Sequence, residues 1–197
     1  MSEEQITIVT GLPRTGTSMM MNMLEKGGIE PLTDHEREPN IDNPKGYYEF
    51  ERVKDLPEDT GWLEDARGKA VKVLAELVKH LPEDYEYRVI FMRRKLEEVI
   101  ESQKKMLKRR GEDPNKVSDE ELMNMFTRYL NILEKEVHQH PNMHVLYVDY
   151  NDVVERPIES VEEIAEFFDK KLDKKKMASV VDKDLYRVPV LGGVGQD

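Results

Sequence analysis

The sequence predicts an α/β fold, a P-loop-like parallel sheet flanked by helices, and three observations support this fold class. A β-branched strand at residues 5–10 runs directly into a glycine-containing loop and then into a helix. Further short apolar runs alternate with segments of helical spacing, as in parallel sheets covered on both faces. Because 38% of the 197 residues are hydrophobic and 36% are charged, we expect residues 1–197 to form a single domain with a charged surface.

The order of the elements follows from local patterns. After the first strand we expect a Met-rich helix at residues 19–26, ended by two glycines. Ser118 with Glu121, and Ser160 with Glu163, have the spacing of capping boxes at helix starts. The other expected strands are residues 70–74, 87–92 and 144–149, and the other expected helices are residues 75–80, 95–110, 119–139, 161–169 and 174–181.

Composition and charge exclude several functional classes. The chain has no cysteine, which excludes disulfides, thiolate catalysis and zinc–cysteine sites. Its net charge of −11 argues against nucleic acid as a partner, although two local basic clusters, residues 93–95 and 104–110, suit a small anionic ligand. The acidic N-terminus lacks the charge of a secretory signal, and no run approaches the ~20 apolar residues of a membrane span. We therefore expect no membrane span and a cytoplasmic location.

The loop after the first strand has the geometry of a phosphate-binding loop. Gly11 and Gly16 are separated by four residues, and backbone N–H groups in such a loop converge on an anion at a helix N-terminus. A nucleotide kinase or ATPase would continue with Gly-Lys-Ser or Gly-Lys-Thr, whereas Thr17 and Ser18 follow Gly16 here. The cation of this loop is instead Arg14.

This loop, Gly-Leu-Pro-Arg-Thr-Gly-Thr-Ser, resembles the 5′-phosphosulfate loop of the sulfotransferase family. The resemblance implies the cofactor 3′-phosphoadenosine 5′-phosphosulfate (PAPS), which becomes the product PAP when its sulfuryl group is transferred. Arg14 falls on the loop cation that contacts the leaving group and the sulfuryl group, so it is expected to be catalytic as well as cofactor-binding. No metal is required, because loop amides and cations can supply the electrostatic stabilisation. The other cofactor-binding residues expected in the loop are Thr15, Gly16, Thr17 and Ser18.

A second family signature, for the 3′-phosphate, is an arginine at a strand end followed eight residues later by a serine. Arg94 and Ser102 have this spacing. Arg94 would leave the sheet at its carboxyl edge, where open α/β sheets bind ligands, and Ser102 lies about two turns into the next helix. One phosphate could accept a guanidinium fork and a hydroxyl hydrogen bond there. Arg93 is adjacent, so the sequence leaves both arginines open for this role.

Other matches extend the resemblance along the chain. Tyr150, after the expected strand 144–149, matches a tyrosine that lies near adenine in the family, whereas Asn151 departs from the usual Glu. Arg187 lies where the family closes over the nucleotide and is a further cofactor-binding candidate. Residues 43–49, Asn-Pro-x-Gly-Tyr-Tyr-Glu, are similar to short bacterial-type sulfotransferases.

The general base has to be chosen without the histidine of cytosolic family members. Lys72 matches the lysine of their Lys-Thr-His strand and is expected to be catalytic, but no histidine follows it. We expect Glu49 to be the base, because partial burial can raise a glutamate pKa toward the working range. A surface or helix-cap glutamate is the alternative interpretation of Glu49, and His35 is the reserve candidate. Lys69 either binds the cofactor or is solvated.

No sequence pattern identifies the acceptor substrate. Residues 30–61 are expected to form the acceptor-binding loop, and its aromatic residues suit a small molecule, a glycan or a lipid head group equally. The predicted function is transfer of a sulfuryl group from PAPS to a hydroxyl or amine. One alternative is a P-loop kinase or NTPase, since the strand ending at Asp149 resembles one that holds Mg²⁺. Another is a nucleotide-binding module without catalysis. His138 and His140 have no acidic ligand pattern, so no metal site is expected.

Overall fold

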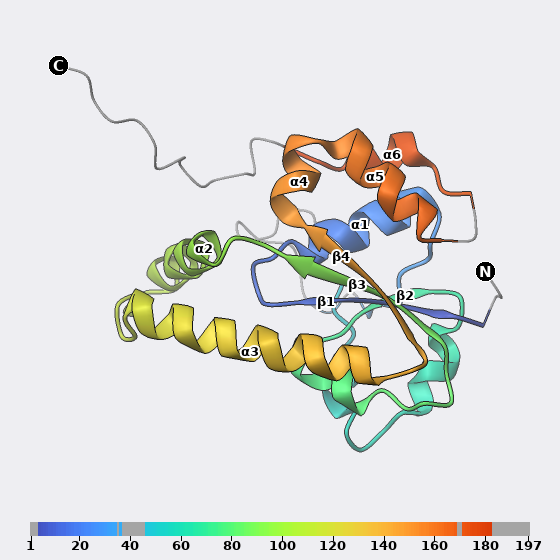
Figure 1. Cartoon of the computed structure of the whole chain (residues 1–197), viewed down its shortest axis with the longest axis horizontal. Helices are drawn as coiled ribbons and strands as arrows, with labels where there is room; N and C mark the ends of the chain where they lie inside the picture. The colour runs from blue at the N-terminus through green and yellow to red at the C-terminus, as the bar shows by residue number, and fades with distance from the viewer. Residues whose placement is uncertain (1–3, 35, 37–45, 169–170, 183–197) are drawn as a thin grey trace.

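The computed structural model describes residues 4–34, 36, 46–168 and 171–182 of the chain. The described residues contain four strands that form one parallel sheet in the order β2-β1-β3-β4. The predicted α/β class is therefore confirmed, with the first strand in the interior of the sheet (Figure 1). The strands are β1 (Ile6–Gly11), β2 (Ala70–Lys72), β3 (Tyr87–Arg93) and β4 (Met143–Asp149).

The register aligns the carboxyl ends of the strands. Gly11 pairs with Met92, and Arg93 pairs with Asp149, so β1, β3 and β4 end at nearly the same level. Lys72, the last residue of β2, pairs with Val9 of β1. Residues that follow these strands therefore gather along one edge of the sheet, where open α/β sheets bind their ligands.

Helices cover the sheet on both faces, and each face has its own apolar core. On one face, α1 buries four methionine and leucine side chains completely, and α4, α5 and α6 complete that layer. On the other face, Leu133 and Val137 of α3 pack with Trp62 and neighbouring apolar residues. The α-helices are α1 (Thr17–Gly27), α2 (Leu96–Arg109), α3 (Asp119–Gln139), α4 (Tyr150–Glu155), α5 (Pro157–Glu166) and α6 (Lys174–Ala178), and the short 3₁₀ helices are η1 (Glu51–Asp55), η2 (Gly61–Ala66) and η3 (Ala75–His80).

The predicted helix starts were right in one case and wrong in the other. Ser118 and Glu121 form the reciprocal hydrogen bonds of a capping box at the start of α3, as predicted. The helix predicted from residue 161 begins instead at Pro157, and Ser160 lies inside it. Proline has a fixed φ and lacks the N–H that a first helical turn cannot use, so Pro157 is a better start than the serine. The short helix α4 was not predicted.

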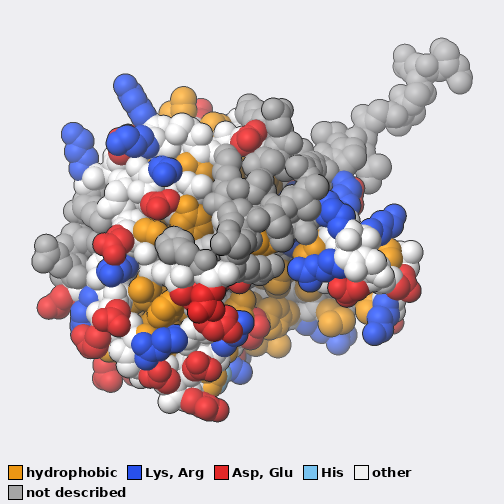
Figure 2. Space-filling view, turned by 180° about the vertical axis from the view of Figure 1, so that it is seen from behind, with side chains coloured by type: hydrophobic (Ala, Val, Ile, Leu, Met, Phe, Trp, Pro, Cys, Tyr) orange, Lys and Arg blue, Asp and Glu red, His pale blue; other side chains and the backbone are white. Residues whose placement is uncertain are grey.

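The α2–α3 hairpin extends beyond the sheet, as Figure 1 shows. In the view from behind, Lys and Arg side chains gather at this projecting end (Figure 2), where Lys108, Arg109 and Arg110 are exposed. Local positive charge thus exists in a chain of net charge −11. Within the described residues, no helix is long and apolar enough to cross a membrane.

Candidate cofactor and acceptor site

The predicted phosphate loop connects β1 to the N-terminus of α1 at the carboxyl edge of the sheet. Three of its residues have left-handed or otherwise positive φ angles: Gly11 at 144°, Arg14 at 74° and Gly16 at 92°. Thr15 is 1% exposed, and its Oγ1 donates to the carbonyl of Leu12 at 2.7 Å, which closes the loop on itself. Arg14 is not a glycine, so its positive φ stores backbone strain of the kind that is concentrated at functional sites.

Both loop glycines are required by close contacts. A Cβ on Gly11 would lie 2.5 Å from the carbonyl oxygen of Met92, and a Cβ on Gly16 would lie 2.4 Å from Cδ2 of Tyr150. The ring of Tyr150 therefore packs directly against the backbone where α1 begins. Gly16 is the N-cap of α1, a helix of 11 residues, and a glycine provides no side chain to satisfy the first N–H groups. The loop fits an anion, because these N–H groups and the helix dipole point toward it.

The structure brings two predicted cofactor residues into contact. Arg14 Nε donates a hydrogen bond to Ser102 Oγ over 3.0 Å, although the residues are far apart in sequence. The loop cation and the serine of the predicted 3′-phosphate pair therefore lie side by side. Ser102 is half-buried on α2, two turns after its N-terminus.

Arg94 lies beneath the loop rather than in open solvent, with a side chain that is 8% exposed. Its NH1 donates to the backbone carbonyl of Arg14 at 3.0 Å, and its Nε donates to Glu98 Oε2 at 2.9 Å. Its guanidinium carbon lies 4.3 Å from the centre of the Tyr150 ring. Asn151 joins the group by donating to the other carboxylate oxygen of Glu98 at 2.8 Å.

The neighbouring Arg93 points to a different set of partners. Its NH2 contacts Glu134 of α3 at 2.7 Å, and its guanidinium lies 3.8 Å from the centre of the Tyr147 ring. Of the two arginines that the sequence left open, Arg94 is therefore the one in contact with the phosphate loop. Burial raises the pKa of the Tyr150 hydroxyl, Arg94 and Arg14 oppose that shift, and Glu98 adds to it.

One backbone carbonyl of the expected acceptor loop contacts both the phosphate loop motif and β2. The carbonyl oxygen of Tyr47 accepts a hydrogen bond from Ser18 Oγ at 3.2 Å and another from Lys72 Nζ at 2.6 Å. Ser18 belongs to the phosphate loop motif and Lys72 to the end of β2, so this carbonyl ties the acceptor loop to both. The side chain of Tyr47 is buried.

The two predicted catalytic residues of the acceptor side also meet. Lys72 Nζ lies 3.4 Å from Glu49 Oε1, and the two side chains are 11% and 35% exposed. The backbone carbonyl of Glu49 accepts a hydrogen bond from Thr33 Oγ1 at 2.8 Å, which fixes the chain at this point. The arrangement places a half-buried carboxylate next to a lysine, two residues after Tyr47, whose carbonyl contacts Ser18.

Tyr48 provides a second strained position, with a φ of 52°. Its hydroxyl donates to Glu25 Oε2 of α1 at 2.7 Å. Burial raises the pKa of Tyr48 well above its ordinary value, and Glu25 raises it further, so the hydroxyl stays a hydrogen-bond donor. This contact anchors the segment between Tyr47 and Glu49 to α1.

Several predicted residues lie elsewhere. His35 and Arg187 fall outside the described residues. Lys69 pairs with Glu30 at 3.1 Å, which favours the solvated interpretation of that lysine. The aromatic residues expected to suit an acceptor serve the core in part, since Trp62 is completely buried and Phe50 packs edge-on against it at 5.6 Å between ring centres.

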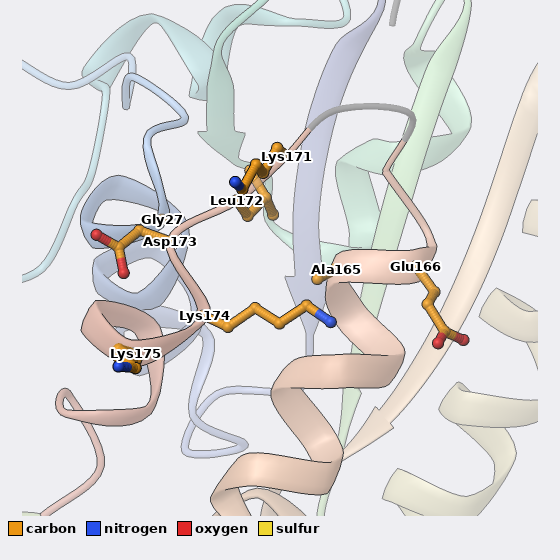
Figure 3. Close-up of a pocket in the computed structure, with 8 residues that line it drawn as sticks. All are labelled: Gly27, Ala165, Glu166, Lys171, Leu172, Asp173, Lys174 and Lys175. Atoms are coloured by element: carbon orange, nitrogen blue, oxygen red, sulfur yellow. The ribbon is translucent and has the colours of Figure 1, made fainter.

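No group of three His, Asp or Glu residues in the described ranges could hold a metal ion. The described chain also has a hollow that is not part of this site. A hollow of about 610 Å³ opens where α1 ends (Figure 3), with lysines 171, 174 and 175 at its rim. Gly27, in its wall, is separated from the phosphate loop by the whole length of α1, roughly 16 Å at 1.5 Å per residue.

Sequence reasoning missed Glu98 and the role of Asn151. Glu98 is buried within a helix whose pattern predicted only an apolar face, and its position four residues after Arg94 was the only available signal. The role of the Tyr47 carbonyl had no signal, because a backbone oxygen is present at every residue.

A family model described as the sulfotransferase family matches residues 33–174, which is well over half of the chain. The chain therefore belongs to the sulfotransferase family, and the predicted family is confirmed. The comparison with curated proteins found no match to the sequence.

Solved structures with the same fold are also sulfotransferases. Mouse sulfotransferase SULT7A1 complexed with PAP has a TM-score of 0.57 at 15% identity over 92% of this chain, which spans 64% of the mouse protein. Sulfotransferase STF1 from Mycobacterium tuberculosis H37Rv has a TM-score of 0.55 at 17% identity, over 89% of this chain and 70% of that one. The sulfotransferase domain of the Synechococcus PCC 7002 olefin synthase has a TM-score of 0.54 at 16% identity, over 98% and 90%. At these identities the likeness establishes the fold.

Proposed function

We propose that the chain is a PAPS-dependent sulfotransferase that moves the sulfuryl group to a hydroxyl or amine of an acceptor. The observation that carries this proposal is the cluster of Arg14, Ser102 and Arg94 around the phosphate loop. ATP carries no phosphate on the ribose 3′ position, so a kinase has no use for a 3′-phosphate site, whereas PAPS carries a 3′-phosphate in addition to its 5′-phosphosulfate. Family membership supports the same choice over a P-loop kinase or NTPase.

The donor side of the site fits a nucleotide with two anionic groups. The N–H groups at Gly16, Thr17 and Ser18 face the 5′ end through the helix N-terminus. Ser102 and Arg94 are proposed to hold the 3′-phosphate, and Tyr150 is proposed to lie near the adenine. PAPS supplies an activated sulfuryl group, and the chain supplies orientation and charge stabilisation.

The transfer step assigns a role to each end of the site. The acceptor oxygen or nitrogen forms a bond to sulfur while the bond between sulfur and the bridging phosphate oxygen breaks, and the electron pair of that bond stays on PAP. Arg14 stabilises the charge that develops on the bridging oxygen. Glu49 takes the acceptor proton, and Lys72 holds the Glu49 carboxylate in place at 3.4 Å.

The segment from residue 30 to residue 61 is proposed to bind the acceptor, because its residue Tyr47 is tied to Ser18 and Lys72 at the transfer site. The acceptor class remains a small molecule, a glycan or a lipid head group. We propose that the whole chain acts as one domain, without a required metal.

Calorimetric titration of PAP and ADP without Mg²⁺, followed by transfer of radiolabelled sulfate from PAPS to a panel of phenols, sugars and amines, tests the proposal. We expect clearly tighter binding of PAP than of ADP, and labelled product with at least one acceptor class. Equal affinities would remove the case for a 3′-phosphate site, and ATP turnover that requires Mg²⁺ would favour the kinase. Tight PAP binding without transfer to any acceptor would favour the non-catalytic module.

A further inference from the structure

A buried carboxylate beside the phosphate loop has no role in the function proposed above. Glu98 lies on the first turn of α2, and its side chain is 10% exposed. Each of its oxygens accepts a hydrogen bond from a different segment: Oε2 from Arg94 Nε at 2.9 Å, and Oε1 from Asn151 Nδ2 at 2.8 Å. Two donors of this kind hold the carboxylate in one orientation.

The orientation of Glu98 is passed on to the loop through Arg94. With Nε bound to Glu98 and the guanidinium over the Tyr150 ring, the plane of the Arg94 side chain is set by α2 and α4 together. In that plane, NH1 reaches the carbonyl oxygen of Arg14 at 3.0 Å. The guanidinium is therefore a rigid link between Glu98 and the backbone of the phosphate loop.

The carbonyl that Arg94 binds belongs to a strained residue. Arg14 has a φ of 74°, a conformation that non-glycine residues hold only when surrounding contacts impose it. The direction of its peptide determines where its side chain leaves the loop, and that side chain reaches Ser102 Oγ at 3.0 Å. Glu98 thus acts indirectly, through Arg94, on the backbone of Arg14 and on the contact between Arg14 and Ser102.

The charge of Glu98 matters as well as its geometry. A buried arginine without a carboxylate partner would attract any anion through net charge alone. With Glu98 at 2.9 Å, the positive charge of Arg94 is compensated. A phosphate then gains binding free energy only if its oxygens accept hydrogen bonds from donors held in fixed directions. This arrangement favours discrimination by position over general anion binding.

We propose that Glu98 and Asn151 are positioning residues that enable the site to distinguish a nucleotide with a 3′-phosphate from one without it. Neither residue is required to touch the ligand; together they fix Arg94, and through it the backbone of Arg14. This inference rests on the proposed function, since it presumes that PAP and ADP bind at the loop.

The test compares PAP and ADP affinities of Asn151→Ala and Glu98→Gln by calorimetry, with the thermal midpoint of each variant. Asn151→Ala leaves every charge in place and removes one hydrogen bond to Glu98, so we expect PAP binding to weaken about tenfold, the loss typical of one bond to a charged group. ADP binding should change by no more than about twofold, since ADP lacks the phosphate that the positioned donors recognise. Glu98→Gln should reduce the PAP preference further, and it should tighten the binding of inorganic sulfate.

A matched control is available on the opposite face of the sheet. Glu134→Gln removes the carboxylate of the Arg93 pair, a contact of similar length, and should leave the ratio of PAP to ADP affinity unchanged. If Glu98→Gln does not fold, Asn151→Ala and Glu134→Gln still form the comparison.

The outcomes distinguish the proposed function from the positioning role of Glu98 and Asn151. Equal binding of PAP and ADP by the wild type would overturn the proposed function. A wild-type preference for PAP that Asn151→Ala and Glu98→Gln retain would overturn the positioning role alone. Parallel losses for PAP and ADP with a lowered thermal midpoint would also overturn it, because they would mark a purely structural role.

Discussion

The proposed cofactor side and the proposed acceptor side of the site meet at α1, but they are built in different ways. On the cofactor side, side chains from three segments converge: Arg94 after β3, Ser102 on α2 and Tyr150 after β4. On the acceptor side, the main link is a backbone carbonyl, that of Tyr47, which accepts hydrogen bonds from Ser18 and Lys72. One side depends on particular residue types, and the other depends on the path of the chain.

This difference predicts how each side can change. We expect substitution of Arg94, Ser102 or Tyr150 to impair binding of the nucleotide, because each supplies a donor or a ring. Apart from Glu49 and Lys72, side chains on the acceptor side can vary while the carbonyl of residue 47 keeps its two hydrogen bonds. Loops on a rigid scaffold can vary in this way without loss of the fold.

The largest expected effect tests the acceptor side. Glu49→Gln removes the proposed proton acceptor and keeps the side chain's shape beside Lys72. Loss of a general base typically costs about 10²–10⁴-fold in turnover, and we expect kcat to fall within that range. PAP affinity should stay within about threefold, because the cofactor side is untouched. Steady-state transfer from PAPS and calorimetry of PAP measure the two quantities.

Glu30→Gln is the control for this prediction, because Glu30 also pairs with a lysine, Lys69, which immediately precedes the start of the same strand. Its kcat should match that of the wild type. A Glu49→Gln variant as active as Glu30→Gln would show that Glu49 only neutralises Lys72, and the base would then have to lie elsewhere.

The second effect tests the cofactor side. Arg14→Ala removes the loop cation, and loss of one preorganised donor costs about 10²–10³-fold in kcat, or roughly 3–4 kcal/mol. PAP binding should weaken less, because the loop amides and Arg94 remain. Arg14→Lys should recover part of the turnover, since a point charge can reach the same oxygen. Near-normal kcat in Arg14→Ala would reduce Arg14 to a structural partner of Ser102.

The contrast between the two sides also explains how much the sequence could predict. Strand and helix positions followed from apolar periodicity, and the expected cofactor residues followed from the resemblance of short motifs to those of the sulfotransferase family. Arg14, Arg94, Ser102 and Tyr150 were identified in this way, and the structure brings all four together. A motif specifies residue types, and the proposed cofactor side depends on side chains of particular types.

What the sequence could not predict has physical causes of its own. Glu49, which contacts Lys72, follows a left-handed residue, Tyr48, and left-handed backbone at a tyrosine has no sequence signal. The start of α5 at Pro157 was wrongly placed because a serine–glutamate pair occurred one turn later. The charge compensation by Glu98 depends on burial, which emerges only when α2 and α4 are packed.

A smaller effect concerns the contact between Gly16 and Tyr150. Gly16→Ala places a Cβ 2.4 Å from the ring and requires an alanine at a φ of 92°. We expect the free energy of unfolding to fall by about 1–3 kcal/mol, which lowers the thermal midpoint by roughly 2–4 °C per kcal/mol in a domain of this size. PAP affinity should fall as well, because the N-terminus of α1 must move.

Gly28→Ala is the control that separates backbone strain from the steric contact with Tyr150. Gly28 has a φ of 102°, and an added Cβ would meet nothing within 4 Å. Its variant should show the backbone cost alone, with PAP affinity preserved. Equal PAP affinities for the two variants would show that the Tyr150 contact does not position the loop.

The smallest expected effect concerns the acceptor side and follows from loss of the hydrogen bond between Tyr48 and Glu25. Tyr48→Phe removes a donor 2.7 Å from a half-exposed carboxylate, so the free energy of unfolding should fall by about 0.5–1.5 kcal/mol at pH 8. Loss of this hydrogen bond should lower kcat several-fold while PAP affinity is unchanged, since only the segment that holds Glu49 loosens.

The pH dependence of that difference identifies the hydroxyl as its source. The pKa of Tyr48 is raised in the folded chain, whereas an unfolded tyrosine ionises near pH 10. Above about pH 10 the unfolded wild type loses a proton that the folded form retains, so ionisation favours unfolding, and the wild-type advantage over Tyr48→Phe should shrink as the pH rises. Urea unfolding of both proteins at pH 8 and near pH 11 measures this, and the other tyrosines, present in both, cancel in the comparison. A difference that stays constant between the two pH values would attribute the effect to ring packing, and the backbone carbonyl of Tyr47 would then hold the acceptor loop without help from Tyr48.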